Sequence, residues 1–438
     1  MPLNPVIVAL VLALLPFLGL AGLSAMRRPV VLLATYAAIV PFGSSLAVPG
    51  IGGSFGTVST ILALLISGML VVKLLLGGDR APELPAPLPW WMLVVVAAML
   101  TVAWSIDTSA TMGGIVVLLS LLMLYVVASL VDVRPEGLIT IGTASAVSGA
   151  LVGVTALVQL ATGTMATEPV TGVPRFALAG GGGETGDPNI TAAGLMLPLS
   201  IAVFRAVERG RSRRSRSLYS LGAGLTVTAI LLTGSRGGIL GLMAITGVLL
   251  LAEPARRPSP RHVLIGLLVV SALFTLTPTN VQERLQDASS TGRTDIWRIG
   301  LAACDDYCLL GSGWATFRQV HARGLLESPD RIGWVFGYDP HNVWLQMLVQ
   351  AGVLALVLFT GALVVSYRAL RRVPAAWRGP PMAALTALLA ANIFVSNFDF
   401  KYFWLTLLYV NLSLTASGYL RNGAVQGLPR ESHALVGG

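Results

Sequence analysis

Apolar runs long enough to cross a bilayer recur along almost the whole of this 438-residue chain. A transmembrane helix needs about 20 mainly apolar residues, because the hydrocarbon core of a bilayer is about 30 Å thick. Only 11% of the residues are charged and 55% are hydrophobic, which leaves too few polar side chains to cover a soluble globule of this size. We therefore predict an all-α polytopic membrane protein.

The pattern of these runs predicts about 12 to 13 transmembrane helices. The span 29–45 is the least regular, because Pro41 and Gly43 interrupt it. The first run is interpreted as a retained span and not as a secretory signal, since Arg27 and Arg28 follow it. The expected spans are 5–25, 29–45, 57–77, 88–105, 111–131, 138–162, 189–206, 218–234, 236–252, 263–278, 343–366, 380–397 and 402–418.

The distribution of arginine predicts the orientation of these spans, because basic residues favour cytoplasmic loops. The arginine-rich segment 205–217 is therefore placed inside. Alternation of the other loops then leaves three basic residues in short outer loops, which are Arg175, Arg236 and Lys401. The formal net charge of +9 reflects this topology, and we expect membrane lipids and no nucleic acid among the partners.

The spans divide the chain into four parts. We expect a transmembrane bundle over 1–278 with outer loops at 163–188 and 233–238, an extracytoplasmic loop domain over 279–341, C-terminal transmembrane helices over 342–420 and a cytoplasmic tail over 421–438. The spacing of apolar residues around Trp297 predicts short amphipathic helices that pack on the outer membrane face. In this loop domain, Cys304 and Cys308 fit either a disulfide or two buried thiols.

The short outer loops contain most of the candidate polar residues. In "TGSRGG" (233–238), Ser235 is expected to cap the next helix, and the glycines allow a tight turn with accessible backbone N–H groups. Arg236 then lies at the headgroup level, where it binds a phosphate or extends to lipid. The loop 163–188 is either a second ligand-facing loop or a flexible linker that ends in a helix-start signal.

Two histidines fall on the outer side of this topology. His341 lies where the long loop re-enters the membrane, whereas His321 is expected to be a solvated loop residue. Asp339 either orients His341 or begins a turn before Pro340. Arg293 either contacts a phosphate or begins an amphipathic helix and faces water. Asp399 and Lys401 either pair with each other or reach the site.

Three of these stretches resemble a known motif series. "TGSRGG", "GRTDIWRIGLAACDDYCLLGSGWATF" and "DPHNVWLQMLVQAGVLAL" occur in this order, and the resemblance of the chain to the bacterial O-antigen ligase and polymerase superfamily covers roughly 160–420. The family is similar to GT-C glycosyltransferases in architecture. The resemblance implies transfer of a polyprenyl diphosphate-linked glycan to a hydroxyl of a glycan or lipid-glycan acceptor, outside the bacterial cytoplasmic membrane. It implies no cofactor and no essential metal, and it does not separate ligases from repeat-unit polymerases.

By motif position, the resemblance implies three catalytic residues, His341, Arg236 and Arg293. The chemistry agrees with this set, because guanidinium groups bind a departing diphosphate in a bidentate way and histidine is the usual base near neutral pH. The expected substrate-binding residues are Arg175, Ser235, Gly237, Asp187, Asn189, Asp339 and Asn342.

A transporter or flippase is the alternative from a different class. Such proteins usually carry ionisable groups near the bilayer midplane and often have repeated halves. Here the spans contain almost no charge and no duplication is evident, while polar residues gather on one side. This pattern favours chemistry at the outer surface.

Overall fold

Helices form nearly all of the regular structure. The computed structural model describes residues 28–46, 57–76, 84–167, 172–178, 186–252, 271–275, 277–286, 293–326 and 338–421. The first elements are α2 (Pro29–Ile39), η1 (Val40–Ser45), α3 (Val58–Leu76), α4 (Pro87–Leu100), η2 (Thr101–Trp104), α5 (Thr108–Ser129) and α6 (Pro135–Thr162). Two short antiparallel strands follow, β1 (Ala166–Thr167) and β2 (Pro174–Arg175).

The second half of the chain contains more short helices. The elements here are α7 (Pro188–Gly194), α8 (Met196–Ala206), α9 (Arg213–Leu232), α10 (Arg236–Gly247), η3 (Val248–Ala252), α12 (Thr279–Gln286), α13 (Arg293–Ala302), α14 (Cys304–Tyr307), α15 (Phe317–Leu326), α16 (Val343–Arg371), α17 (Ala375–Ala391) and α18 (Lys401–Arg421).

The helices confirm an all-α polytopic membrane protein. In the described part of the chain, 6 helices are long and apolar enough to cross a membrane, and Pro29–Gly43 and Arg236–Leu251 are shorter apolar helices. Helices also cover the expected spans near 218–234, 380–397 and 402–418. The expected span 5–25 and most of 263–278 lie outside the described residues, so the total of 12 to 13 stays a prediction.

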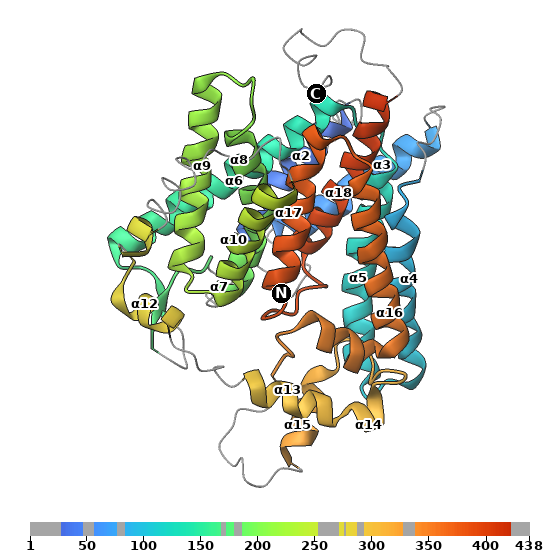
Figure 1. Cartoon of the computed structure of the whole chain (residues 1–438). Coiled ribbons are helices and arrows are strands. Elements are labelled where there is room, and N and C mark those ends of the chain that lie inside the picture. The colour runs from blue at the N-terminus through green and yellow to red at the C-terminus, as the bar shows by residue number, and fades with distance from the viewer. Residues whose placement is uncertain are drawn as a thin grey trace, which may run out of the picture.

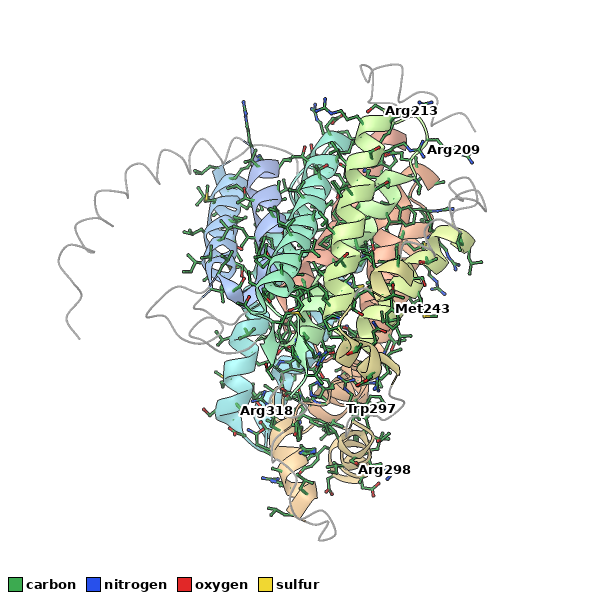
Figure 2. The ribbon with its side chains drawn as sticks, turned by 90° about the vertical axis from the view of Figure 1, so that its left-hand side faces the viewer. Arg209, Arg213, Met243, Trp297, Arg298 and Arg318 are labelled. Carbon is green, nitrogen blue, oxygen red and sulfur yellow. A yellow bond between two sulfur atoms is a disulfide. The ribbon has the colours of Figure 1, made fainter. Side chains whose placement is uncertain are left out.

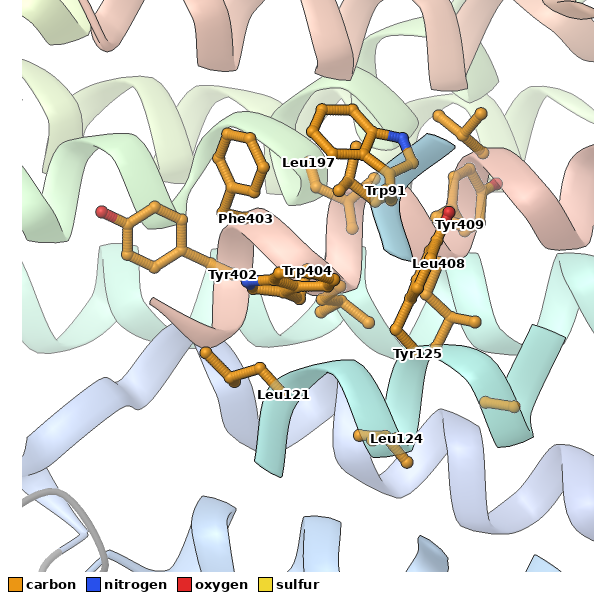
Figure 3. Close-up of a cluster of buried hydrophobic side chains, with 14 of the residues drawn as sticks. Trp91, Leu121, Leu124, Tyr125, Leu197, Tyr402, Phe403, Trp404, Leu408 and Tyr409 are labelled. Carbon is orange, nitrogen blue, oxygen red and sulfur yellow. The ribbon is translucent and has the colours of Figure 1, made fainter. Parts of the chain in front are cut away.

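Helix α18 packs in the centre of an aromatic core (Figure 3). Trp404 contacts Tyr125 of α5 with ring centroids 5.4 Å apart, and Phe403 contacts Trp91 of α4 at 6.0 Å. All four side chains are buried. Because large aromatic side chains bury much surface and pack in fixed geometries, this core holds α4, α5 and α18 together.

Short helices cover one end of the bundle. Helices α13, α14 and α15, here called the cap (residues 293–326), lie together at that end (Figure 1). Arg209 and Arg213 lie at the other end, far from Trp297, Arg298 and Arg318 of the cap (Figure 2). The molecule therefore has an arginine-rich end and a cap end.

Residues 308–316, here called the anchor segment, lie within the cap between α14 and α15 and contact α16. Helix α16 is broken at Gly352, whose φ is 82°. A Cβ at Gly352 would lie 2.7 Å from the carbonyl oxygen of Leu309, so glycine is required for this close approach. The freed backbone groups of α16 pair with the anchor segment, since Ser312 N donates to Val349 O at 2.8 Å and Val353 N donates to Cys308 O at 2.8 Å.

The anchor segment also reaches the ends of α4 and α5. Trp314 is fully buried, and its backbone N donates to Thr101 Oγ1 at 3.0 Å. Gly313 has a φ of 114°, and a Cβ there would collide with the side chain of Ser105. Cys308, the first residue of this segment, forms a disulfide with Cys304, which decides between the two alternatives left by their spacing.

Candidate functional site

Four helices begin at the cap end of the bundle, close to the candidate residues. Helices α7, α10, α13 and α16 start at Pro188, Arg236, Arg293 and Val343. Helices α10 and α7 contact each other, as do α13 and α16. Backbone N–H groups at helix starts carry partial positive charge, so this end of the bundle favours an anion.

The hairpin turn before α10 depends on close packing. Ser235 Oγ accepts from Gly238 N at 3.2 Å, which is the expected cap. A Cβ at Gly237 would lie 3.0 Å from the carbonyl oxygen of Ala391, at the end of α17. Gly237 is therefore required for the contact between α10 and α17, and its contact with a substrate stays a prediction. Arg236 is half-buried at the start of α10.

Arg175 joins the hairpin turn to the start of α7. Its side chain is 1% exposed, its Nε donates to Thr233 O at 2.7 Å, and its Nη2 donates to Asn189 Oδ1 at 3.3 Å. Asp187 caps α7, with its Oδ1 accepting from Asn189 N at 2.7 Å. Because its guanidinium binds these protein atoms, Arg175 positions the segments that carry Arg236 and Asp187.

An aromatic contact brings α13 to the connection between α17 and α18. The Arg293 guanidinium carbon lies 5.4 Å from the ring centroid of Phe394, and Trp297 stacks on Phe394 with centroids 6.3 Å apart. Trp297 Nε1 donates to Pro340 O at 3.0 Å. Arg293 and Trp297 are one helical turn apart, so one face of α13 reaches both Phe394 and the residue before His341.

Asn342 fixes the start of α16. Its Oδ1 accepts from the backbone N of Trp344 at 2.9 Å and of Leu345 at 3.0 Å, and its Nδ2 donates to Ile393 O at 3.2 Å. These contacts give Asn342 a capping role. They also fix the backbone beside His341, which has a φ of 46°. Non-glycine residues rarely adopt this left-handed conformation, and such strain is common at functional sites.

Four charged side chains act on His341. Burial lowers the pKa of its imidazole below the usual 6.5, and the positive charges of Arg293 and Arg318 lower it further. Asp187 and Asp339 oppose this shift. The imidazole is therefore neutral at pH 7 and able to accept a proton.

Arg318 is the residue that sequence reasoning missed. Its Nε and Nη2 donate to the two carboxylate oxygens of Asp339 at 3.0 and 2.7 Å. Asp339 is therefore the partner of an arginine, and the described structure has no hydrogen bond between Asp339 and His341. Arg318 lies in α15, 21 residues earlier in the chain, and no local pattern connects the two.

Asp399 lies close to the same charges, in the connection before α18. The pKa of its carboxyl is raised to about 6, with burial as the main cause and the charge of Asp339 as a further one, while Arg318 opposes the shift. Lys401 has a different partner, since its Nζ donates to Thr57 Oγ1 at 2.6 Å. In the described structure these two residues do not form an ion pair. We call His341, Arg293, Arg318, Asp339 and Asp399 the charged rim.

The expectation that His321 is a solvated loop residue is wrong. Its side chain is fully buried in the cap, between Phe317 with ring centroids 6.5 Å apart and Tyr338 at 5.7 Å. Neither ring nitrogen has a hydrogen-bond partner among the described residues. The amphipathic pattern of α15 places His321 on the inner face of this helix, four residues after Phe317.

Comparisons with known proteins agree with the motif series. Residues 221–360 match the family model described as O-antigen ligase. The chain is also 26% identical over 296 residues to the exopolysaccharide production protein ExoQ of Rhizobium meliloti (strain 1021). This alignment spans 64% of the present chain and 64% of that relative. Over these parts of its length, the chain is therefore similar to proteins of an O-antigen ligase-like superfamily.

Proposed function

We propose that this protein transfers a glycan from a polyprenyl diphosphate to an acceptor hydroxyl, outside the bacterial cytoplasmic membrane. The observation that carries the proposal is the position of His341, a neutral imidazole in a group of charges that includes Arg293 and Arg318. A base next to guanidinium groups is what a glycosyl diphosphate reaction requires. The match of 221–360 to the O-antigen ligase model supports the same reaction class.

In the proposed mechanism, the acceptor oxygen attacks the anomeric carbon of the donor sugar. The bond from this carbon to the diphosphate oxygen breaks, and the polyprenyl diphosphate leaves with the bonding electrons. The hydroxyl proton goes to His341. Arg236 and Arg293 bind the diphosphate and neutralise its developing charge, which a divalent metal does in other enzymes. Neighbouring helix starts contribute further positive potential.

The charged rim also suggests how His341 remains a base. Arg293 lowers the pKa of the imidazole, so protonation in the resting state is disfavoured. When the diphosphate binds, its negative charge offsets that of the arginines, and the imidazole becomes a stronger base next to the bound donor. The proposed site is therefore most basic when the donor is present.

Repeat-unit polymerisation is the second candidate within the same chemistry. It is favoured by the similarity to a protein whose name gives it a role in exopolysaccharide production. A polymerase uses the end of another lipid-linked glycan as acceptor, whereas a ligase uses a different molecule. The same base and diphosphate-binding arginines serve both reactions.

The test is a transfer assay with purified full-length protein and a radiolabelled lipid-linked repeat unit. The proposal predicts release of polyprenyl diphosphate together with a labelled glycoside. Products that grow by single repeat units support polymerisation, and transfer of one preassembled chain to a separate acceptor supports ligation. If label stays on the lipid with either kind of acceptor, or merely crosses the bilayer of a proteoliposome, glycosyl transfer is excluded.

A further inference from the structure

A groove of about 380 Å³ lies between α6 and α9, close to the arginine-rich end of the bundle. Its lining includes Thr143, Val147, Ala150, Arg214, Leu218 and Tyr219. Part of its apolar wall is open to the surface, since Val147 is 53% and Leu218 is 61% exposed. In a membrane protein such apolar walls face lipid.

Small residues explain why the groove has this position. A Cβ at Gly153 would collide with the backbone of Leu225, so α6 and α9 touch at that level. One turn earlier, a Cβ at Gly149 would lie 3.1 Å from Thr226 Oγ1. Toward the arginine-rich end, even a Cβ at Gly222 would lie 3.6 Å from the Ala150 Cβ, at ordinary contact distance. The two helices therefore separate toward that end and leave the groove between them.

The groove has one polar end and one apolar end. Thr143 and Tyr219 are joined across it by a hydrogen bond of 2.8 Å between their hydroxyl groups. Ser212, Arg214 and Ser215 line the same end. From Thr143 to Ala150 the groove follows α6 for about 10–12 Å, which is close to the hydrocarbon depth of one leaflet, about 15 Å. This shape suits an amphiphile with its headgroup at the arginines.

The charge at the polar end is not balanced by nearby acids. Glu208 is the acidic residue of segment 205–217, and it already pairs with Arg205 at 3.0 Å and with Arg211 at 2.5 Å. Arg214 is exposed and has no ion-pair partner in the described part of the chain. Guanidinium groups bind phosphate well, and basic residues beside membrane helices attract anionic lipids.

We propose that the groove between α6 and α9 binds an anionic glycerophospholipid. The phosphate contacts Arg214 and the hydroxyls of Ser212 and Ser215, and one acyl chain lies along Val147, Ala150 and Leu218. This site is separate from the proposed glycan transfer, because it lies at the opposite end of the bundle from the charged rim. Binding of such a lipid also explains why the groove is apolar over most of its length and basic only at its polar end.

The test measures lipid binding to the purified full-length protein in dodecyl maltoside by native mass spectrometry. Dioleoyl phosphatidylglycerol should bind saturably and more tightly than dioleoyl phosphatidylcholine. Arg214→Gln should weaken phosphatidylglycerol binding about fivefold, the effect of one basic residue near a membrane surface. Arg213→Gln is the matched control, because Arg213 is the adjacent exposed arginine and does not line the groove.

A second pair of variants tests the apolar part of the groove. Val147→Trp should fill it and reduce binding, whereas Val158→Trp should not, since Val158 is similarly exposed on α6 at 55% but lies outside the groove. The proposal is overturned by equal binding of the two lipids. Equal losses in Arg213→Gln and Arg214→Gln, or normal binding in Val147→Trp, would also overturn it.

Discussion

The anchor segment and the charged rim both include residues of the cap, and they are built in opposite ways. The anchor segment is held by backbone hydrogen bonds to the broken turn of α16 and by the fully buried Trp314. The charged rim consists of ionisable side chains, and the side chains of Arg318 and Asp339 are 65% and 48% exposed. Structural glycines belong to the first region and titratable groups to the second.

This difference separates stability from chemistry. Buried backbone contacts and close packing fix the cap but leave no group free to react. Charges at a partly exposed surface add little stability, because solvent screens them, yet they can act on a substrate. We therefore expect changes in the anchor segment to reduce the amount of folded protein and changes in the charged rim to reduce the rate of transfer.

The largest expected effect on stability is that of Trp314→Ala. Removing a fully buried tryptophan should lower the free energy of unfolding of the cap by about 3–5 kcal/mol, because the cavity cannot close fully. Thermal unfolding of the detergent-solubilised protein measures the loss. The transfer rate per folded molecule should stay close to that of the native protein. A transfer rate that falls by more than the loss of folded protein would contradict the separation of stability from chemistry.

Arginine-to-lysine changes should have the next largest effect, on rate alone. Arg236→Lys keeps the positive charge but removes the planar pair of donors, so we expect transfer to fall by about 10²–10³-fold. Arg293→Lys should behave similarly, with an additional loss of its contact with Phe394. Expression and thermal stability should stay near normal for Arg236→Lys. Near-normal turnover would exclude a diphosphate role for Arg236.

The pH dependence of transfer should reveal the charges around His341. The base must be neutral in the free enzyme, and burial together with Arg293 lowers its pKa below 6.5, so the acidic limb of kcat/KM should lie below pH 6.5. Arg293→Gln removes one of the causes of this shift, which should move the acidic limb to higher pH. A limb that stays in place in this variant would mean that another group is titrating.

The smallest expected effect on stability is that of Asp339→Asn. An exposed ion pair such as Arg318–Asp339 contributes about 0.2–1 kcal/mol, so unfolding should change little. The same variant removes a negative charge that raises the pKa of His341, so its acidic limb should move to lower pH. A large loss of stability would mean that Asp339 has a structural role, like the residues of the anchor segment, and would contradict its assignment to the charged rim.

Sequence reasoning found the features that depend on local pattern. Apolar periodicity predicted the membrane helices, and the grouping of Arg236, Arg293 and His341 in one site stays a prediction of the motif series. In the structure, Arg293 acts on His341, and Arg175 connects the hairpin of Arg236 to α7. Capping by Ser235 follows from its helix-start pattern, whereas Asn342 was expected to bind substrate and caps α16 in the structure.

Features that depend on how the cap folds against the membrane helices could not be predicted from the sequence. Arg318 meets Asp339 only because α15 folds back toward the start of α16. The break of α16 at Gly352 depends on the insertion of the anchor segment. From the sequence alone, a single glycine within an apolar run is compatible with an unbroken helix. His321 was expected to be a solvated loop residue, and it is covered because Phe317 and Tyr338 pack on its ring in the folded cap.

The most direct test of the division of roles compares donor binding and single-turnover transfer in His341→Ala. Because the arginines hold the diphosphate and the imidazole accepts the proton, this variant should bind a labelled lipid-linked glycan nearly as well as the native protein. Its transfer step should be slower by about 10²–10⁴-fold. Substantial remaining transfer, or a complete loss of donor binding, would contradict the assignment of His341 as the base.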